Sequence, residues 1–188
     1  MDYFLQKVGG RPARQTVTLR RCTPAEAPAV FALQNEVRAA MPHPEQFVPD
    51  TLENIADYLR TGVCIGAWQQ GRLGAYLILR LCGQSSENYA AFLGVPQSQW
   101  QHWANADSAV VHPDWRGNGL QRAMLEAEGY KPSNYMGGYS YWYWCNVKDT
   151  ARDVANMNLR TAQASGFVIR CRREMYGGYD RYLLEKQL

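Results

Sequence analysis

Apolar residues follow two different spacings along the chain, one typical of strands and one typical of helices. Alternating or β-branched segments such as TVTLR at 16–20 predict strands, whereas apolar residues three and four positions apart predict one face of a helix. Strands are predicted at 16–20, 63–68, 73–81, 105–112, 139–147, 167–172 and 179–184. Helices are predicted at 24–37, 52–59, 119–128 and 149–165, with a short helical piece at 87–93 inside a segment that breaks the strand pattern.

The order of these elements predicts one α/β (α+β) domain. Thr23 and Pro24 are the residue types that favour the start of a helix, at the N-cap and at the first helical position. A chain of 188 residues has the length of a single domain. Residues 1–15 are mostly polar and are predicted to form a loose N-terminal arm, so that the domain spans 16–188.

Composition narrows the class of protein. The hydrophobic fraction of 46% and the charged fraction of 20% exclude a disordered chain. A net charge of +3 is too small to indicate a nucleic-acid or membrane partner. No apolar run approaches the roughly 20 residues that a membrane-spanning helix needs, and the first ten residues do not resemble a secretory signal. We therefore expect a cytoplasmic protein with no nucleic-acid and no membrane partner.

The cysteines and histidines do not form a disulfide or metal-binding pattern. The five cysteines are widely scattered without a CxxC pair, and several lie in apolar runs, which favours reduced, buried thiols. His43, His102 and His112 share no spacing typical of metal ligands. We expect no metal site.

The run VVHPDWRGNGLQ at 110–121 carries the strongest chemical signal. It joins the end of a predicted strand, a loop with two glycines and the start of a predicted helix. Backbone N–H groups in such a loop converge on an anion, and Arg116 adds a positive charge. Asn118-Gly119 is also a common hairpin turn, but the helical spacing after it favours the anion loop. Because the run lacks the P-loop and dinucleotide patterns, we expect a pyrophosphate ligand of another kind.

The same run resembles the acyl-CoA-binding segment of the GNAT superfamily of N-acyltransferases. RGNG at 116–119 fits the pattern of that segment, whereas Gln121 stands where a small residue is more usual. NMNLRTAQASGF at 156–167 resembles the later helix of the family, and YGGYDRYLLEK at 176–186 resembles its final hairpin. The resemblance covers about residues 16–186. It implies a GNAT-like mixed, mostly antiparallel central sheet of six or seven strands, flanked by helices, with splayed central strands.

The resemblance also implies that acetyl-CoA is the co-substrate and which residues bind it. The implied binding residues are Val110, Val111, Arg116, Gly117, Asn118, Gly119, Leu120, Gln121 and Asn158. The loop would hold the pyrophosphate, while the backbone of Val110 and Val111 would pair with the pantetheine arm and polarise the thioester carbonyl. Asn158 stands where the family often places a side chain facing CoA, and the alternative is a solvated helix residue.

Acyl transfer to an amine needs a group that takes a proton, because a lysine amine with a pKa of about 10.4 is charged at neutral pH. The resemblance implies a carboxylate on the strand before the CoA loop. Asp107 is the only carboxylate in the predicted strand 105–112, and it is our candidate base. The alternative is that Asp107 is a solvated residue of the strand. Weaker candidates for the base are Glu36, Glu45 and Glu53.

The group that would protonate the departing thiolate is less clearly marked. The family often places a tyrosine four residues before the glycine that ends the later helix, and that position is Ala162 here. Tyr143 and Tyr176 are the candidates that could replace it. The thiolate could also leave unaided, because the pKa of a thiol is about 8.5.

Two functions from different classes follow. The first is an N-acetyltransferase that moves an acetyl or other short acyl group from acyl-CoA to a primary amine by direct attack in a ternary complex. The alternative is a non-catalytic acyl-CoA-binding regulatory module of the same fold, which Ala162 favours and Asp107 disfavours. The acceptor is a small-molecule or peptide amine that the sequence does not specify further. A homodimer through the sheet edge is compatible with the pattern.

Overall fold

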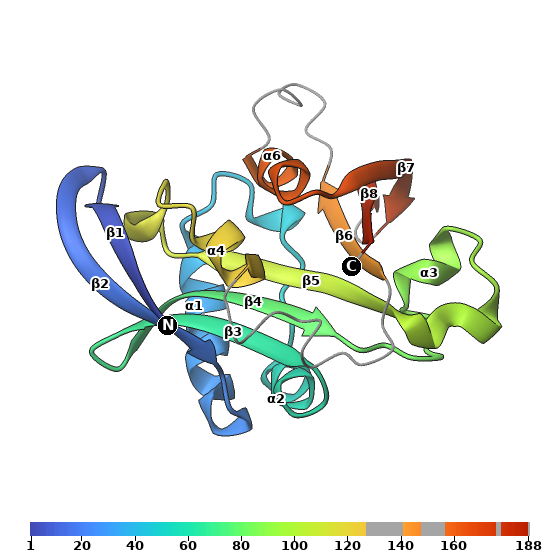
Figure 1. Ribbon diagram of the computed structural model, residues 1–188, viewed down its shortest axis with the longest axis horizontal. Helices are drawn as coiled ribbons and strands as arrows, with labels where there is room; N and C mark the ends of the chain where they lie inside the picture. Colours follow the sequence, from blue (N-terminus) through green and yellow to red (C-terminus); the bar gives the residue numbers. More distant parts are fainter. Residues whose placement is uncertain (127–140, 148–156, 176–177, 188) are drawn as a thin grey trace. The chain divides into compact units, whose positions relative to one another are not determined.

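The computed structural model describes residues 1–126, 141–147, 157–175 and 178–187 (Figure 1). Its strands are β1 (Asp2–Val8), β2 (Arg11–Arg21), β3 (Val63–Gln69), β4 (Arg72–Arg80), β5 (Trp103–Val111), β6 (Tyr141–Val147), β7 (Val168–Met175) and β8 (Tyr179–Gln187). Its α-helices are α1 (Ala27–Ala39), α2 (Leu52–Thr61), α3 (Tyr89–Phe92), α4 (Leu120–Glu126) and α6 (Met157–Ala164). Short 3-10 helices are η1 (Pro24–Glu26), η2 (Pro44–Gln46), η3 (Gln97–His102) and η4 (Pro113–Trp115).

The chain forms two compact units. The first contains Met1–Leu79 and continues from Ser108 to the end of α4, and the second contains Arg80–Asp107 and the described residues after 140. Strand β5 therefore contributes its N-terminal part to the second unit and its C-terminal part to the first. The prediction of one domain over 16–188 stays a prediction.

The first unit is built on antiparallel strands in the order β1-β2-β3-β4, with β4 next to β5. The β3–β4 hairpin turns at Gln70 and Gly71, whose φ angles of 48° and 80° lie in the left-handed region that tight hairpin turns require. Helices α1 and α2 pack against one another, and α2 packs against β3 (Figure 1). Their buried residues Val30, Leu33, Ile55 and Leu59 join a core that also contains Val110 of β5.

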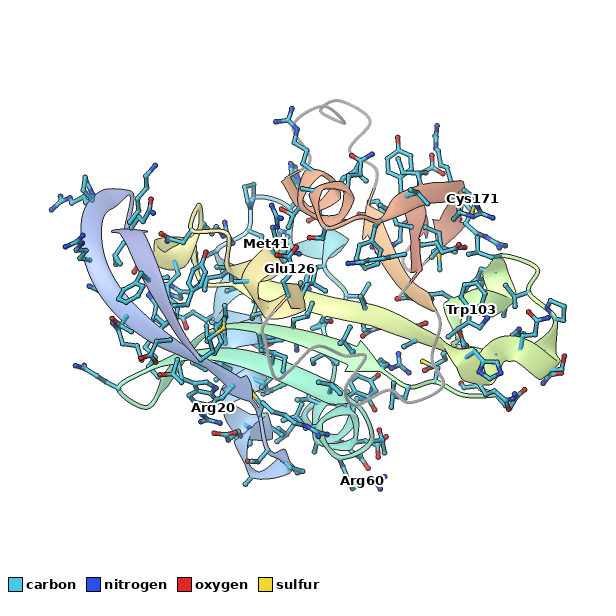
Figure 2. The ribbon with its side chains drawn as sticks, in the orientation of Figure 1. Arg20, Met41, Arg60, Trp103, Glu126 and Cys171 are labelled. Carbon is cyan, nitrogen blue, oxygen red and sulfur yellow. The ribbon has the colours of Figure 1, made fainter. Side chains whose placement is uncertain are left out.

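The second unit has the strand order β5-β6-β8-β7. Strand β5 pairs parallel with β6 from Trp103↔Tyr141 to Ala106↔Trp144, whereas β8 pairs antiparallel with both β6 and β7. A small core gathers Tyr89, Ala90, Trp103 and Leu183, and Figure 2 labels Trp103 at the start of β5. The predicted mixed, mostly antiparallel sheet is therefore confirmed. The described residues form eight strands rather than the six or seven that were predicted.

The additional strand comes from the segment that was predicted to be a loose arm. Residues 1–15 instead contain β1 and the start of β2, which form an antiparallel hairpin. Gly9 and Gly10 make the turn, with φ angles of 56° and 77°, and Leu5 is fully buried. The prediction was wrong because the polar residues of β1 outnumber its single buried side chain, so the alternation is weak.

The remaining predicted elements agree with the structure where it describes them. The helix predicted at 149–165 is observed as α6, and its first part lies outside the described residues. The short helical piece at 87–93 is observed as α3. None of the helices in the described part of the chain is long and apolar enough to cross a membrane.

Candidate active site

Buried side chains hold the loop between β5 and α4 in place. After β5 ends, η4 begins with Pro113, and the Nδ1 atom of His112 accepts a hydrogen bond from the backbone N–H of Asp114 at 3.2 Å. The indole of Trp115 is buried and lies against Gly74 of β4. This close approach requires glycine at 74, because a Cβ there would lie 2.3 Å from the Trp115 ring.

Substitution of Gly74 by alanine is expected to destabilise the fold by about 2–3 kcal/mol, because the rigid Trp115 ring must move out of a packed site. A thermal denaturation curve would then show a fall in Tm of roughly 5–10 °C. The matched control is Gly71→Asn in the turn of the same hairpin, where nothing lies within 4 Å of the added Cβ. Equal Tm values for Gly74→Ala and wild type would contradict the packing of Trp115 on β4.

The two glycines of the loop are exposed, and the side chains of the residues that follow each of them are buried. Gly117 and Gly119 have φ angles of 77° and 71° and are exposed, whereas Asn118 between them and Leu120 after them are buried. No atom lies within 4 Å of the position where a Cβ of Gly117 would stand. The exposed side of this loop is therefore backbone, which suits the close approach of an anion.

The predicted binding residues around the glycines are arranged in the same unit. Arg116 is exposed, and its Nε donates a hydrogen bond to the Val111 carbonyl at 3.3 Å, so its charge stays beside the loop. The side chain of Val110 belongs to the core, and Gln121 is half-buried at the start of α4. Val110 and Val111 lie beyond Ala106, the last β5 residue in register with β6. Among the residues that the structure describes, the backbone at this end of β5 is thus outside the β5–β6 pairing.

A cluster around His112 was not predicted from the sequence. Nδ1 of His112 accepts from the Asp114 backbone N–H, and Nε2 on the other side of the ring lies 3.0 Å from Oε1 of Glu36 and 3.1 Å from the guanidinium of Arg72. Arg72 lies 3.6 Å from the same Glu36 oxygen. These contacts join α1 and β4 to the start of the glycine loop. They give Glu36, one of the weaker candidates for the base, a partner that holds it in place.

Asp107 lies in the second unit, where two side chains hydrogen-bond it. Its Oδ1 accepts from the hydroxyl of Tyr89 at 3.3 Å and from NH1 of Arg80 at 3.5 Å. Arg80 also pairs with Glu87. No described residue donates a hydrogen bond to Oδ2 of Asp107. Within the described part of the chain, the carboxylate is therefore held through one of its two oxygens.

The environment of Asp107 favours the protonated carboxyl more than water does. Its side chain is only 12% exposed, and this burial raises the pKa of Asp107 above its usual value. The Arg80 charge and the Tyr89 hydrogen bond offset part of that increase. A carboxylate with a raised pKa is a stronger base than a solvated aspartate, which is the property that proton abstraction from an amine requires.

Asn105 orders the segment that supplies the partners of Asp107. It is fully buried, its Oδ1 accepts from the Tyr89 backbone N–H at 3.1 Å, and its Nδ2 donates to the Glu87 carbonyl at 3.0 Å. These bonds fasten α3 to β5 at the position of Asp107. These contacts of Asn105 were not predicted from the sequence, because its partners lie in a segment of irregular pattern.

The structure does not describe the side chain of either candidate for the acid that protonates the thiolate. Tyr143 lies in β6 opposite Asn105, and only its backbone is described. Tyr176 lies outside the described residues, and Asn158 lies in α6 without a described side chain. Ala162 is fully buried in α6. Glu53 and Glu45, the other weaker candidates for the base, are exposed.

Comparison with known proteins identifies the fold. No family model matches the sequence, and no curated protein matches it. A GNAT-family acetyltransferase of Streptococcus pneumoniae superposes with a TM-score of 0.66 at 17% identity, over 92% of this chain and 99% of that one. The ribosomal-protein-S18-alanine N-acetyltransferase of Escherichia coli gives a TM-score of 0.63 at 16% identity, over 91% and 93%.

A third structure, that of yncA from Salmonella typhimurium with its cofactor acetyl-CoA, gives a TM-score of 0.65 at 15% identity, over 92% of this chain and 94% of that one. The chain thus has a mixed α+β fold with a glycine loop after its central strand. This is the fold of the GNAT acetyltransferases along most of the chain, and the predicted fold class is confirmed.

Proposed function

We propose that the protein is an acetyl-CoA-dependent N-acetyltransferase that moves an acetyl or other short acyl group to a primary amine by direct attack in a ternary complex. The observation that carries the proposal is the loop after β5, where Gly117 and Gly119 present exposed backbone beside Arg116. The likeness in fold to a structure that holds acetyl-CoA supports the same assignment.

The residues present fit acetyl-CoA. The open space at Gly117 and the exposed guanidinium of Arg116 suit a pyrophosphate, since a side chain at 117 would stand between ligand and backbone. Leu120 packs inward, so its contribution to binding is its backbone N–H. The backbone of Val110 and Val111 would pair with the pantetheine arm, and one N–H would polarise the thioester carbonyl. Acetyl-CoA supplies the activated acyl group.

In this proposal Asp107 acts as the general base. Its Oδ2 takes the proton that the amine loses as nitrogen bonds to the acyl carbon, directly or through a water molecule. Arg80 and Tyr89 keep the carboxylate in one orientation through Oδ1. The bond from carbon to sulfur breaks, and the CoA thiolate takes a proton from Tyr143, Tyr176 or solvent.

Release of free thiol from acetyl-CoA, measured against a panel of amines, tests the proposal. The panel contains polyamines, amino acids, aminoglycosides and peptides with a free N-terminus or lysine. We expect thiol release above the amine-free rate with at least one class, together with a product that has gained one acetyl group. The buried Ala162 favours the non-catalytic module instead. That module would bind acetyl-CoA tightly and release no thiol with any amine.

A further inference from the structure

The edge of β1 is joined to the glycine loop through the side chain of Asn118. The register of β1 with β2 shifts between Leu5 and Lys7, where two residues of β2 stand opposite the single residue Gln6. At this irregularity the backbone N–H groups of Gln6 and Lys7 both donate to Oδ1 of Asn118, at 2.8 and 3.0 Å. Two successive N–H groups of β1 are therefore directed at the middle of the loop.

The carboxamide of Asn118 also donates a hydrogen bond to the same strand. Its Nδ2 donates to the Lys7 carbonyl at 2.8 Å, so that Lys7 meets one carboxamide with both its N–H and its C=O, as it would meet a neighbouring strand. The residue opposite Lys7 on β2 is Pro12, which has no N–H to offer. Asn118 therefore makes the hydrogen bonds to Lys7 that a neighbouring strand would make at the edge of β1.

Further hydrogen bonds tie the hairpin to the loop on either side of this contact. The Tyr3 hydroxyl donates to the Asn118 carbonyl at 2.5 Å, and the Gly9 N–H donates to the Asp114 carbonyl at 2.8 Å. Within the loop, Nδ2 of Asn118 also donates to the Trp115 carbonyl at 2.9 Å. In Figure 1 the β1–β2 hairpin, drawn in blue, lies beside the loop that precedes α4. The loop is thus fixed from Asp114 to Asn118.

We propose that the β1–β2 hairpin is part of the acyl-CoA site and that Asn118 is a positioning residue, which holds the backbone of Gly117 and Gly119 in its binding conformation without touching the ligand. This inference rests on the proposed function. Asn118 is only 9% exposed and its carboxamide faces β1. Its side-chain oxygen and nitrogen are therefore used in hydrogen bonds to the hairpin. Ordering the loop before the ligand arrives removes an entropic cost from binding.

Asn118→Ala tests the inference, with acetyl-CoA as the probe in calorimetric titration and in steady-state kinetics. Loss of the carboxamide leaves the Gln6 and Lys7 N–H groups without their acceptor and frees the loop. We expect the Kd and the KM for acetyl-CoA to rise about tenfold, with kcat and the KM for the amine changed less than twofold.

Two further variants separate positioning from a general loss of stability. Tyr3→Phe removes the hydroxyl that donates to the Asn118 carbonyl and should raise the Kd about threefold while the protein stays folded. Thr18→Ala is the matched control, since it removes a hydrogen bond to Asp2 within the same hairpin and none to the loop, and its Kd should equal that of wild type. Folding of each variant is checked by its Tm.

The results of these measurements distinguish a failure of the inference from a failure of the proposed function. Wild-type affinity for acetyl-CoA in a folded Asn118→Ala or in Tyr3→Phe overturns the inference and leaves the proposed function standing. Equal weakening by Thr18→Ala and Tyr3→Phe also overturns it, because the effect would then come from hairpin stability. Absence of acetyl-CoA binding by the wild-type protein overturns the proposed function itself.

Discussion

Asp107→Asn is expected to lower kcat/KM at neutral pH by about 10²-fold or more, within the usual range for the loss of one acid or base. Asparagine keeps the size of the side chain and an oxygen that accepts from Tyr89 and Arg80, so the fold and the affinity for acetyl-CoA should be unchanged. What is lost is the ability to take a proton. The measurement is the pH profile of kcat/KM for variant and wild type side by side.

The pKa of Asp107 determines the direction of that pH dependence. Only the carboxylate form accepts a proton, and burial raises the pKa of Asp107, so the acid limb of the wild-type profile lies above the usual aspartate range. The variant has no such limb. Its deficit should shrink at high pH, where the amine is already neutral and needs no base.

Glu87→Gln is the matched control for Asp107→Asn. Glu87 pairs with the same Arg80, but its side chain is 60% exposed, so its loss should change kcat/KM less than about twofold. If the profiles of Asp107→Asn and wild type coincide in shape and height, Asp107 is a structural residue. An equal loss in Glu87→Gln would point to Arg80 rather than to proton transfer.

Gly119→Val is expected to weaken acetyl-CoA binding by roughly 10–100-fold. A β-branched residue at a φ of 71° carries backbone strain of about 1–3 kcal/mol, and its Cβ would lie 3.2 Å from the Tyr3 hydroxyl. The loop must therefore shift, and on the proposed function the valine methyl groups would stand where the pyrophosphate approaches the backbone. Calorimetric titration with acetyl-CoA measures the change in Kd.

Gly94→Val provides the comparison for that substitution. Gly94 has nearly the same φ, 70°, with nothing within 4 Å of an added Cβ, and it lies in the second unit after α3. Both variants should lose similar stability, but only Gly119→Val should lose affinity. Unchanged affinity in a folded Gly119→Val would remove the loop from the binding site.

The loop after β5 could be predicted because its determinants are local. Pro113, the two glycines and the helical spacing after Leu120 lie within a dozen residues, and each restricts the backbone near its own position. The structure places β5 before this loop and α4 after it, as the pattern predicts, whereas the 3-10 helix η4 was not predicted. The same local reasoning predicted the strands at 63–68 and 73–81, which form the β3–β4 hairpin.

The hydrogen bonds that hold the loop could not be predicted, because they join segments that are far apart in the sequence. Asn118 bonds to Lys7, 111 residues earlier, and no spacing in the sequence indicates such a contact. The shift in register in β1 becomes visible only once β1 is paired with β2. The same limit applies to Asp107, whose partner Arg80 lies 27 residues away on another strand.

Transfer of a labelled acetyl group tests the central claim most directly. The protein is incubated with acetyl-CoA deuterated in its acetyl group and with the amine that gives the strongest thiol release, and the amine is then examined by mass spectrometry. We expect a product that carries the deuterated acetyl group on nitrogen, formed by the wild-type protein and about 10²-fold more slowly by Asp107→Asn at neutral pH. A wild-type protein that binds acetyl-CoA and leaves every amine unlabelled would contradict the central claim.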